Sequence, residues 1–244
     1  MKGLRLFILS IIVFMISGCA AAQIALEHKD LAVQTQMSQT IFLEPTPPEK
    51  KTVWIEVKNT SDKQMELPNL SALLAQRGYR VVTDPNKTSY RLQVNILSVG
   101  KCDPSALNQS IYAGWGGAMG GAAAGAALGF SGNSPSGPLV GGIVGGLTGG
   151  VTDLIAGSLV KNVTYAIVTD IQISEYSEKP VVEQHIANIQ KGAQTTVEQE
   201  SSEMSNWKIY RTRIGSSANR VNLAFEEAQP AIVSGLEKSL AGIF

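Results

Sequence analysis

The chain has 244 residues, of which 44% are hydrophobic and 16% are charged, and its 20 basic and 20 acidic residues give a formal net charge of zero. A neutral chain without a basic stripe does not have the electrostatic footprint of a nucleic-acid-binding protein. The two histidines, His28 and His185, lie in polar surroundings without ligands at metal-binding spacing, so a metal site is not expected.

The first 18 residues predict a targeting segment. Lys2 and Arg5 form a basic start, and Leu6–Ile16 is an apolar core that is too short to span a bilayer. The following Ser-Gly-Cys resembles a lipoprotein cleavage site, which predicts cleavage before Cys19 and acylation of its thiol. An ordinary signal peptide with an incidental cysteine is the alternative. The next two residues are alanines, which favours sorting to the bacterial outer membrane with a periplasmic domain.

Residues 19–50 predict a lipid-anchored arm, polar and weakly helical up to Gln39, with Ile41–Leu43 as a strand or docking segment. Alternating apolar residues then predict strands, and an amphipathic stretch ending at Gly78 predicts a helix. The expected elements are strands over Lys51–Lys58, Tyr79–Thr83 and Tyr90–Val99, and a helix over Leu67–Arg77.

After residue 161 alternation predicts a strand over Val163–Ser174 that pairs with Tyr90–Val99, and another over Trp207–Ile214. The polar stretch Glu175–Glu203 is expected to be loose. A helix is predicted from Asn219 to the end, with Pro230 as a kink or fresh start. Its apolar side should pack on the sheet and consists of Leu223, Phe225, Ile232, Val233, Leu236, Leu240 and Ile243.

Residues 104–152 contain no charge and hold most of the glycines of the chain. Glycines recur every fourth residue, so on a helix they would form a bare stripe suited to close packing in lipid. The stripe consists of Gly117, Gly121, Gly125 and Gly129, and then of Gly141, Gly145 and Gly149. Each helix would be roughly 28–33 Å long at about 1.5 Å per residue, enough to cross a bilayer.

The two glycine-rich segments are joined by a polar turn with the exposed residues Ser131, Asn133, Ser134, Pro135 and Ser136. The pattern predicts a membrane hairpin over 104–161 inside an α+β periplasmic domain of mixed sheet, formed by 51–103 and 162–244. A flexible glycine-rich linker and a buried soluble hairpin are the alternatives, because periodicity does not distinguish lipid from a protein core.

Catalytic patterns are not found: the chain has no nucleophile elbow and no zinc-protease motif, so neither enzyme activity nor a cofactor is predicted. Cys102 would have no intrachain partner once Cys19 is acylated, which leaves a free thiol or an intersubunit bridge. A carbohydrate-binding lipoprotein would require a polar cleft that the sequence does not locate.

Several blocks together resemble the TraT family of outer-membrane lipoproteins. They are the cleavage site at Cys19, the segments Leu31–Pro45, Val57–Lys63, Asn162–Tyr165 and Val221–Ala228, and the glycine-rich region. The similarity runs along the whole chain in order.

The resemblance implies a function in surface exclusion, the refusal of mating with donors of related conjugative plasmids, and in complement resistance. It also implies a homo-oligomeric ring held in the outer membrane by acylated Cys19, with the residues of the polar turn exposed for recognition. An outer-membrane protein or a donor pilus component would be the partner. The alternative is an oligomeric channel or an envelope-stabilising structural lipoprotein.

Overall fold

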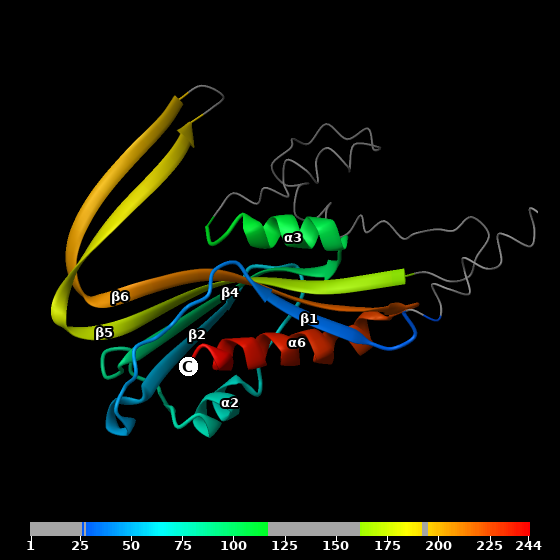
Figure 1. Ribbon diagram of the computed structural model, residues 1–244, viewed down its shortest axis with the longest axis horizontal. Helices are drawn as coiled ribbons and strands as arrows, with labels where there is room; N and C mark the ends of the chain where they lie inside the picture. Colours follow the sequence, from blue (N-terminus) through cyan, green and yellow to red (C-terminus); the bar gives the residue numbers. More distant parts are fainter. Residues whose placement is uncertain (1–25, 27, 117–161, 192–194) are drawn as a thin grey trace, which may run out of the picture.

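The structure is a computed structural model that describes residues 26, 28–116, 162–191 and 195–244, with only the backbone described over 182–191 and 195–203. Six strands form one sheet in the order β1-β6-β5-β4-β2-β3, and helices lie on both of its faces (Figure 1). The strands are β1 (Ala32–Met37), β2 (Thr52–Asn59), β3 (Arg80–Val82), β4 (Tyr90–Lys101), β5 (Asn162–Lys191) and β6 (Thr195–Val221). The helices are the 3-10 helix η1 (Pro48–Lys50), α2 (Leu70–Gln76), α3 (Pro104–Tyr112) and α6 (Phe225–Gly242).

Strand β2 is parallel to both β3 and β4, and parallel and antiparallel pairing meet at β4, whose other neighbour β5 is antiparallel. Parallel neighbours need a crossover connection, and α2 supplies it between β2 and β3. The remaining neighbours are antiparallel, and β4 pairs with β5 in a register that sets Leu92 opposite Ile173. The predicted pairing of Val163–Ser174 with Tyr90–Val99 is therefore confirmed.

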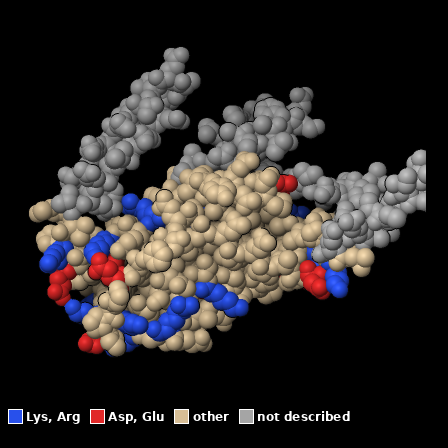
Figure 2. Space-filling view, viewed as in Figure 1, with Lys and Arg blue, Asp and Glu red and all other residues tan. Residues whose placement is uncertain are grey.

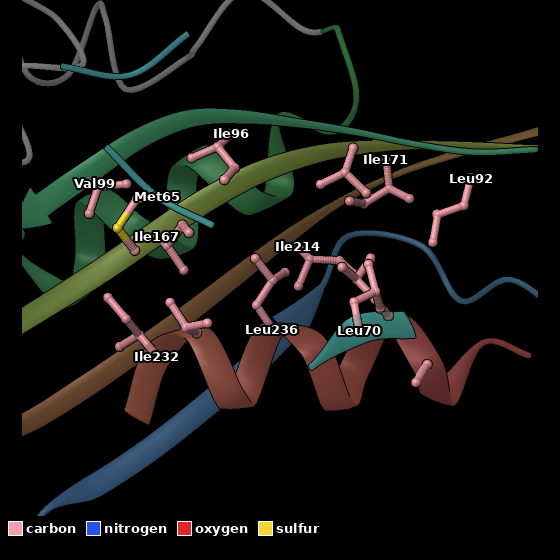
Figure 3. Packing of buried hydrophobic residues seen from close by; sticks show 14 of the residues in the cluster. Met65, Leu70, Leu92, Ile96, Val99, Ile167, Ile171, Ile214, Ile232 and Leu236 are labelled. Atoms are coloured by element: carbon pink, nitrogen blue, oxygen red, sulfur yellow. The ribbon is translucent and has the colours of Figure 1, made fainter. Parts of the chain in front are cut away.

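The main core lies between the sheet and α6, with α2 beside it. Alternate residues point to the same face of a strand, so every second side chain is buried there over Tyr90–Ile96 of β4 and Val163–Ile173 of β5. Ile171, Ile214 and Leu236 meet between strands and helix in Figure 3, and each is completely buried. Burial of this apolar surface is the dominant force that holds α6 on the sheet.

Helix α6 carries the predicted apolar side: Ile232, Leu236 and Leu240 are fully buried, and Phe225 packs against the core. The helix begins at Phe225 rather than at Asn219, because β6 continues to Val221 and Asn222 turns the chain with a positive φ of 52°. Pro230 lies inside an unbroken helix, in its second turn.

Near the N-terminal side, Gly78 ends α2 as predicted, with a φ of 85° that a glycine adopts at little cost. Ile41 is buried in the core and forms no strand, so the docking interpretation of Ile41–Leu43 is confirmed. The expectation of a weakly helical arm is wrong for Ala32–Met37, which is strand β1. Its backbone groups pair with β6, and this tertiary pairing overrides weak local propensity.

The segment Glu175–Glu203 is predicted to be loose, but its described residues, 175–191 and 195–203, form the outer part of a long β-hairpin. Beyond Glu175, β5 pairs only with β6, and the two strands bend away from the sheet together (Figure 1). A register shift between Tyr176 and Val181 accommodates Pro180, which cannot donate a hydrogen bond to a regular ladder.

The predicted fold class, a mixed-sheet domain interrupted by a glycine-zipper transmembrane helical hairpin, is wrong. Over the residues that the structure describes, the molecule is built mostly of sheet with three α-helices, and strands β5 and β6 form its long hairpin. None of the helices in the described ranges combines the length and the apolar character that a membrane crossing requires. Glycine spacing shows only that a packed helix is possible, since each helical glycine costs about 1 kcal/mol relative to alanine.

Candidate functional site

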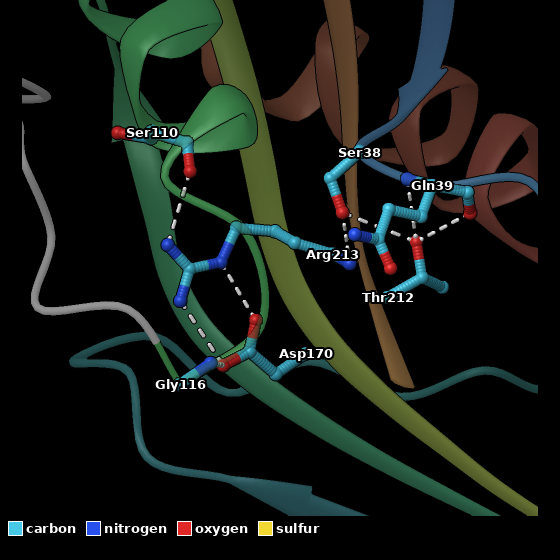
Figure 4. Close-up of polar contacts among 7 residues, drawn as sticks. All are labelled: Ser38, Gln39, Ser110, Gly116, Asp170, Thr212 and Arg213. Carbon is cyan, nitrogen blue, oxygen red and sulfur yellow. Dashed lines mark hydrogen bonds and ion pairs between the residues drawn. The ribbon is translucent and has the colours of Figure 1, made fainter. Parts of the chain in front are cut away.

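A buried ion pair joins β5 and β6 beneath α3 (Figure 4). Asp170 and Arg213 lie opposite each other in the ladder, and the guanidinium binds both carboxylate oxygens, with Nε–Oδ1 and Nη2–Oδ2 distances of 2.6 and 3.0 Å. The side chain of Arg213 is 2% exposed and that of Asp170 is 12% exposed. Bidentate pairing compensates for the removal of both charges from water.

The same pair holds the end of α3 and the chain that follows it. Arg213 Nη1 donates to the carbonyl oxygen of Ser110 at 3.0 Å, which satisfies an acceptor in the last turn of the helix. The backbone N–H of Gly116 donates to Asp170 Oδ2 at 3.2 Å. The ion pair therefore fixes the point at which the chain leaves the sheet before residue 117.

Helix α3 itself is set by its first residues. Asp103 accepts hydrogen bonds from the backbone N–H groups of Ser105 and Ala106, and Pro104 occupies the first helical position, where its missing N–H is not needed. The hydrogen bond from the Ser105 side chain, together with those from the backbone, holds the pKa of Asp103 below its usual value. This short helix is thus defined at its start by its own sequence.

The helix packs closely on the sheet because β6 has a glycine below it. A Cβ on Gly215 would lie 2.6 Å from Ile111 Cδ1 and 3.1 Å from Leu107 Cδ1, so a larger residue would push α3 away. Ala166 and Val168 complete this second, smaller cluster. Cys102 lies in the same cluster as a free thiol, and burial raises its pKa to about 12. The thiol is only 4% exposed in this chain, which favours the free thiol over an intersubunit bridge.

Beyond the ion pair, the same side of the sheet is polar, and α3 does not cover it. Alternate residues of β2, β4, β5 and β6 form rows across the four strands, because each pairs with its neighbour in register. We call this surface the tryptophan face; its residues are Trp54, Glu56, Lys58, Arg91, Gln93, Asn95, Trp115, Gln172, Ser174, Trp207, Ile209 and Arg211.

One row of the tryptophan face is a continuous hydrogen-bonded ladder. Arg211 Nε donates to Gln172 Oε1 at 2.9 Å, Gln172 Nε2 donates to Gln93 Oε1 at 3.0 Å, and Gln93 Nε2 donates to Glu56 Oε2 at 2.8 Å. The bond from Gln93 lowers the pKa of Glu56. All four planar groups are therefore held in fixed orientations.

Two arginines lie on tryptophan rings at the margins of this face. The guanidinium of Arg91 is 3.9 Å from the ring centre of Trp207, and that of Arg211 is 4.6 Å from the ring centre of Trp115. Cation–π contacts of this kind hold the two rings in place. The chain has three tryptophans, and all three line this face.

A second buried carboxylate lies on the opposite side of the sheet. Glu175 is 6% exposed and accepts hydrogen bonds from the hydroxyls of Tyr210, at 2.9 Å, and Tyr90, at 3.4 Å. Burial raises the pKa of Tyr90 to about 12 and, together with the bond to Glu175, also raises that of Tyr210. These hydroxyls stay protonated and serve as donors, so the cluster links β4, β5 and β6.

Charged side chains elsewhere are mixed in sign. In Figure 2 lysines and arginines lie among aspartates and glutamates at the ends of the molecule, and further basic side chains run along its lower edge beneath a largely uncharged centre. Within the part of the chain that the structure describes, no three His, Cys, Asp or Glu side chains come together in a way that could hold a metal ion. The side chains of the tryptophan face can instead accept and donate hydrogen bonds, and its aromatic rings can stack.

The site residues predicted from sequence lie outside the described residues. This holds for Cys19, for the glycine series Gly117, Gly121, Gly125, Gly129, Gly141, Gly145 and Gly149, and for Ser131, Asn133, Ser134, Pro135 and Ser136. Their roles stay predictions.

Sequence reasoning missed the tryptophan face although its signal was present. Within β2 and β4, apolar residues alternate with Trp54, Glu56, Arg91 and Gln93, which is the pattern of one buried and one exposed sheet face. The pairing that aligns these rows could not be read from the pattern alone.

Comparison with known proteins gives a consistent result. Residues 30–244 match the family model of the enterobacterial TraT complement resistance protein. A TraT complement resistance protein of Escherichia coli is 38% identical over 245 residues, covering 100% of this chain and 99% of the relative. Another from Escherichia coli strain K12 is 37% identical, covering 93% of this chain and 92% of its own length. One from Wigglesworthia glossinidia brevipalpis is 26% identical, covering 98% of this chain and 96% of its own. The chain therefore belongs to the TraT complement resistance protein family.

Proposed function

We propose that this protein is an outer-membrane lipoprotein, acylated at Cys19, that protects its host from complement and excludes donors of related conjugative plasmids. The observation that supports this most is similarity to complement resistance proteins along the entire chain, including the segment that contains Cys19. The proposed location follows from that segment, because more than one acyl chain gives lasting membrane anchorage.

In this proposal the α/β domain stands at the membrane and associates with further copies of itself. Exclusion would then operate by occupation of a surface component that a donor must contact, either an outer-membrane protein or part of the donor pilus. Several copies held together at one surface would raise the effective concentration of weak contacts.

The test is expression in a serum-sensitive, plasmid-free bacterial recipient, with survival in serum and the frequency of plasmid transfer from a related donor as the two measurements. The wild-type chain should raise survival and lower transfer. Cys19→Ala should lose both effects, because the protein leaves the membrane fraction. Cys102→Ala is the matched control and should keep both effects. Protection from serum without any fall in transfer would remove surface exclusion from the proposal and leave complement resistance.

A further inference from the structure

We propose that the tryptophan face is a binding site for a linear saccharide chain. The site lies on the open part of the sheet, beyond the ion pair of Asp170 and Arg213. It goes beyond complement resistance and surface exclusion, and its argument does not depend on either.

The shape of the face suits a chain rather than a single compact ligand. Two adjoining hollows of about 250 and 340 Å³ share Gln93 and Gln172 in their linings. The larger has Trp54 and Trp207 among its lining residues, and the smaller has Trp115. The larger volume lies within the range of about 300–1,000 Å³ that is usual for small-ligand sites. Each hollow therefore offers aromatic surface beside shared amide groups.

The polar groups of the ladder are oriented and still have capacity for a ligand. The ladder uses one amide hydrogen and one carbonyl lone pair of Gln93, and the same of Gln172. Each glutamine amide has two hydrogens and two lone pairs, so one of each remains. Hydroxyl groups on neighbouring carbons of a sugar both donate and accept hydrogen bonds, so they complement such amides. The apolar C–H side of the sugar ring would lie against a tryptophan, which provides a large apolar surface.

The charges favour a saccharide over a polyanion. The face has three basic side chains and one carboxylate, and each cation is already engaged with the protein: Lys58 Nζ lies 3.5 Å from the Glu56 carboxylate, whereas Arg91 and Arg211 lie on tryptophan rings. Single-stranded nucleic acid also stacks on aromatic rings, but it requires a positively charged groove along its backbone. An added peptide strand would need an open sheet edge, whereas these side chains project from a sheet face.

The binding test uses the intrinsic fluorescence of the full-length protein in detergent. All three tryptophans of the chain line this face, so a change in tryptophan emission reports on it. We expect a saturable change with chitotetraose or maltotetraose at a dissociation constant of about 1 mM or below. The two probes distinguish an N-acetylhexosamine strand from a glucan. If neither gives a saturable change, or if an oligothymidylate does so in their place, the proposal is overturned.

Variants on α3 and just after it locate the site. Trp115 is 42% exposed and Tyr112 is 85% exposed, so replacing either should leave the fold intact. Trp115→Ala should weaken saccharide binding about tenfold, as measured by calorimetry, and Trp115→Phe should restore most of it because a ring remains. Tyr112→Ala is the matched control, since this aromatic side chain does not line the face, and it should bind as the wild type does. Equal weakening by Trp115→Ala and Tyr112→Ala would overturn the assignment.

Discussion

Under α3, strands β5 and β6 present Ala166, Val168 and Gly215, whereas a few residues further along the same strands present Gln172 and Arg211 on the same side. The first set is small and apolar and lets a helix approach within van der Waals contact. The second set is long and polar and is only partly satisfied by its own ladder. One sheet face thus carries two surfaces of opposite character, and the ion pair of Asp170 and Arg213 marks the boundary between them.

The difference follows from the cost of burying polar groups. A helix laid over Gln172 and Arg211 would remove their remaining hydrogen-bonding groups from water, and each unsatisfied group would cost about 1–3 kcal/mol. At the boundary Arg213 avoids this cost, because its guanidinium binds both Asp170 and the carbonyl oxygen of Ser110. The covered half is therefore built for stability and the open half for contact with a ligand.

The largest difference in stability between the covered and the open half is expected when one arginine is removed from each. Arg213→Ala should lower the free energy of unfolding by about 3–5 kcal/mol, because it leaves the buried Asp170 carboxylate unpaired. Arg211→Ala, two residues along the same strand, should cost only about 1 kcal/mol, since its side chain lies partly in solvent. Urea unfolding followed by circular dichroism measures both. Equal losses of unfolding free energy would mean that the half covered by α3 and the open half do not differ in their contribution to stability.

Cys102 reports whether the covered half stays closed. Burial raises the thiol pKa from 9.0 to about 12, so its thiolate fraction near neutral pH is about a thousandfold below that of an exposed cysteine. Alkylation by iodoacetamide should be slow in the native protein and rapid in urea. The same shift makes stability fall as pH rises from the ordinary thiol pKa toward about 12, because only the unfolded chain ionises there. Rapid native labelling at pH 8 would show that α3 opens readily.

Gly215 tests how closely α3 must approach. Gly215→Ala should cost about 1–3 kcal/mol, because the new Cβ would lie 2.6 Å from Ile111 Cδ1. Ile111→Val removes that atom, so the double variant should lose less than the two single losses added together. Thermal unfolding of the four proteins of the cycle gives the coupling. Additive losses would indicate that another contact sets the position of the helix.

The smallest effect is expected at the start of α3. Asp103→Ala should cost about 1 kcal/mol, the usual value for loss of a helix cap. Since hydrogen bonds lower the pKa of Asp103, its contribution is present above the ordinary carboxyl pKa of 3.8 and is lost as pH falls through the lowered value. Unfolding experiments at pH 6 and pH 3 should therefore show a smaller difference between wild type and variant at pH 3. A difference that does not depend on pH would exclude the carboxylate as the cap.

Sequence alone determined the elements whose signals are local. Alternation located the strands over Lys51–Lys58 and Tyr90–Val99, Gly78 marked a helix end, and helical spacing gave the apolar side of α6. These predictions succeed because the residues that decide each element are neighbours in the chain. Glycine periodicity is a different kind of signal, because it indicates which packing partners a helix could have and not whether the segment forms a helix.

Only the tertiary structure decided which strand residues share a surface. Asp170 and Arg213 are 43 residues apart, and the ladder joins residues from Glu56 on β2 to Arg211 on β6. Each contact depends on the register between strands, and a shift of one residue would turn every side chain to the other face of the sheet. The polar hairpin of β5 and β6 is a further case, because its strands form through pairing with each other rather than through apolar alternation. The chain thus specifies its elements locally, whereas the boundary under α3 and the tryptophan face exist only once the strands have paired.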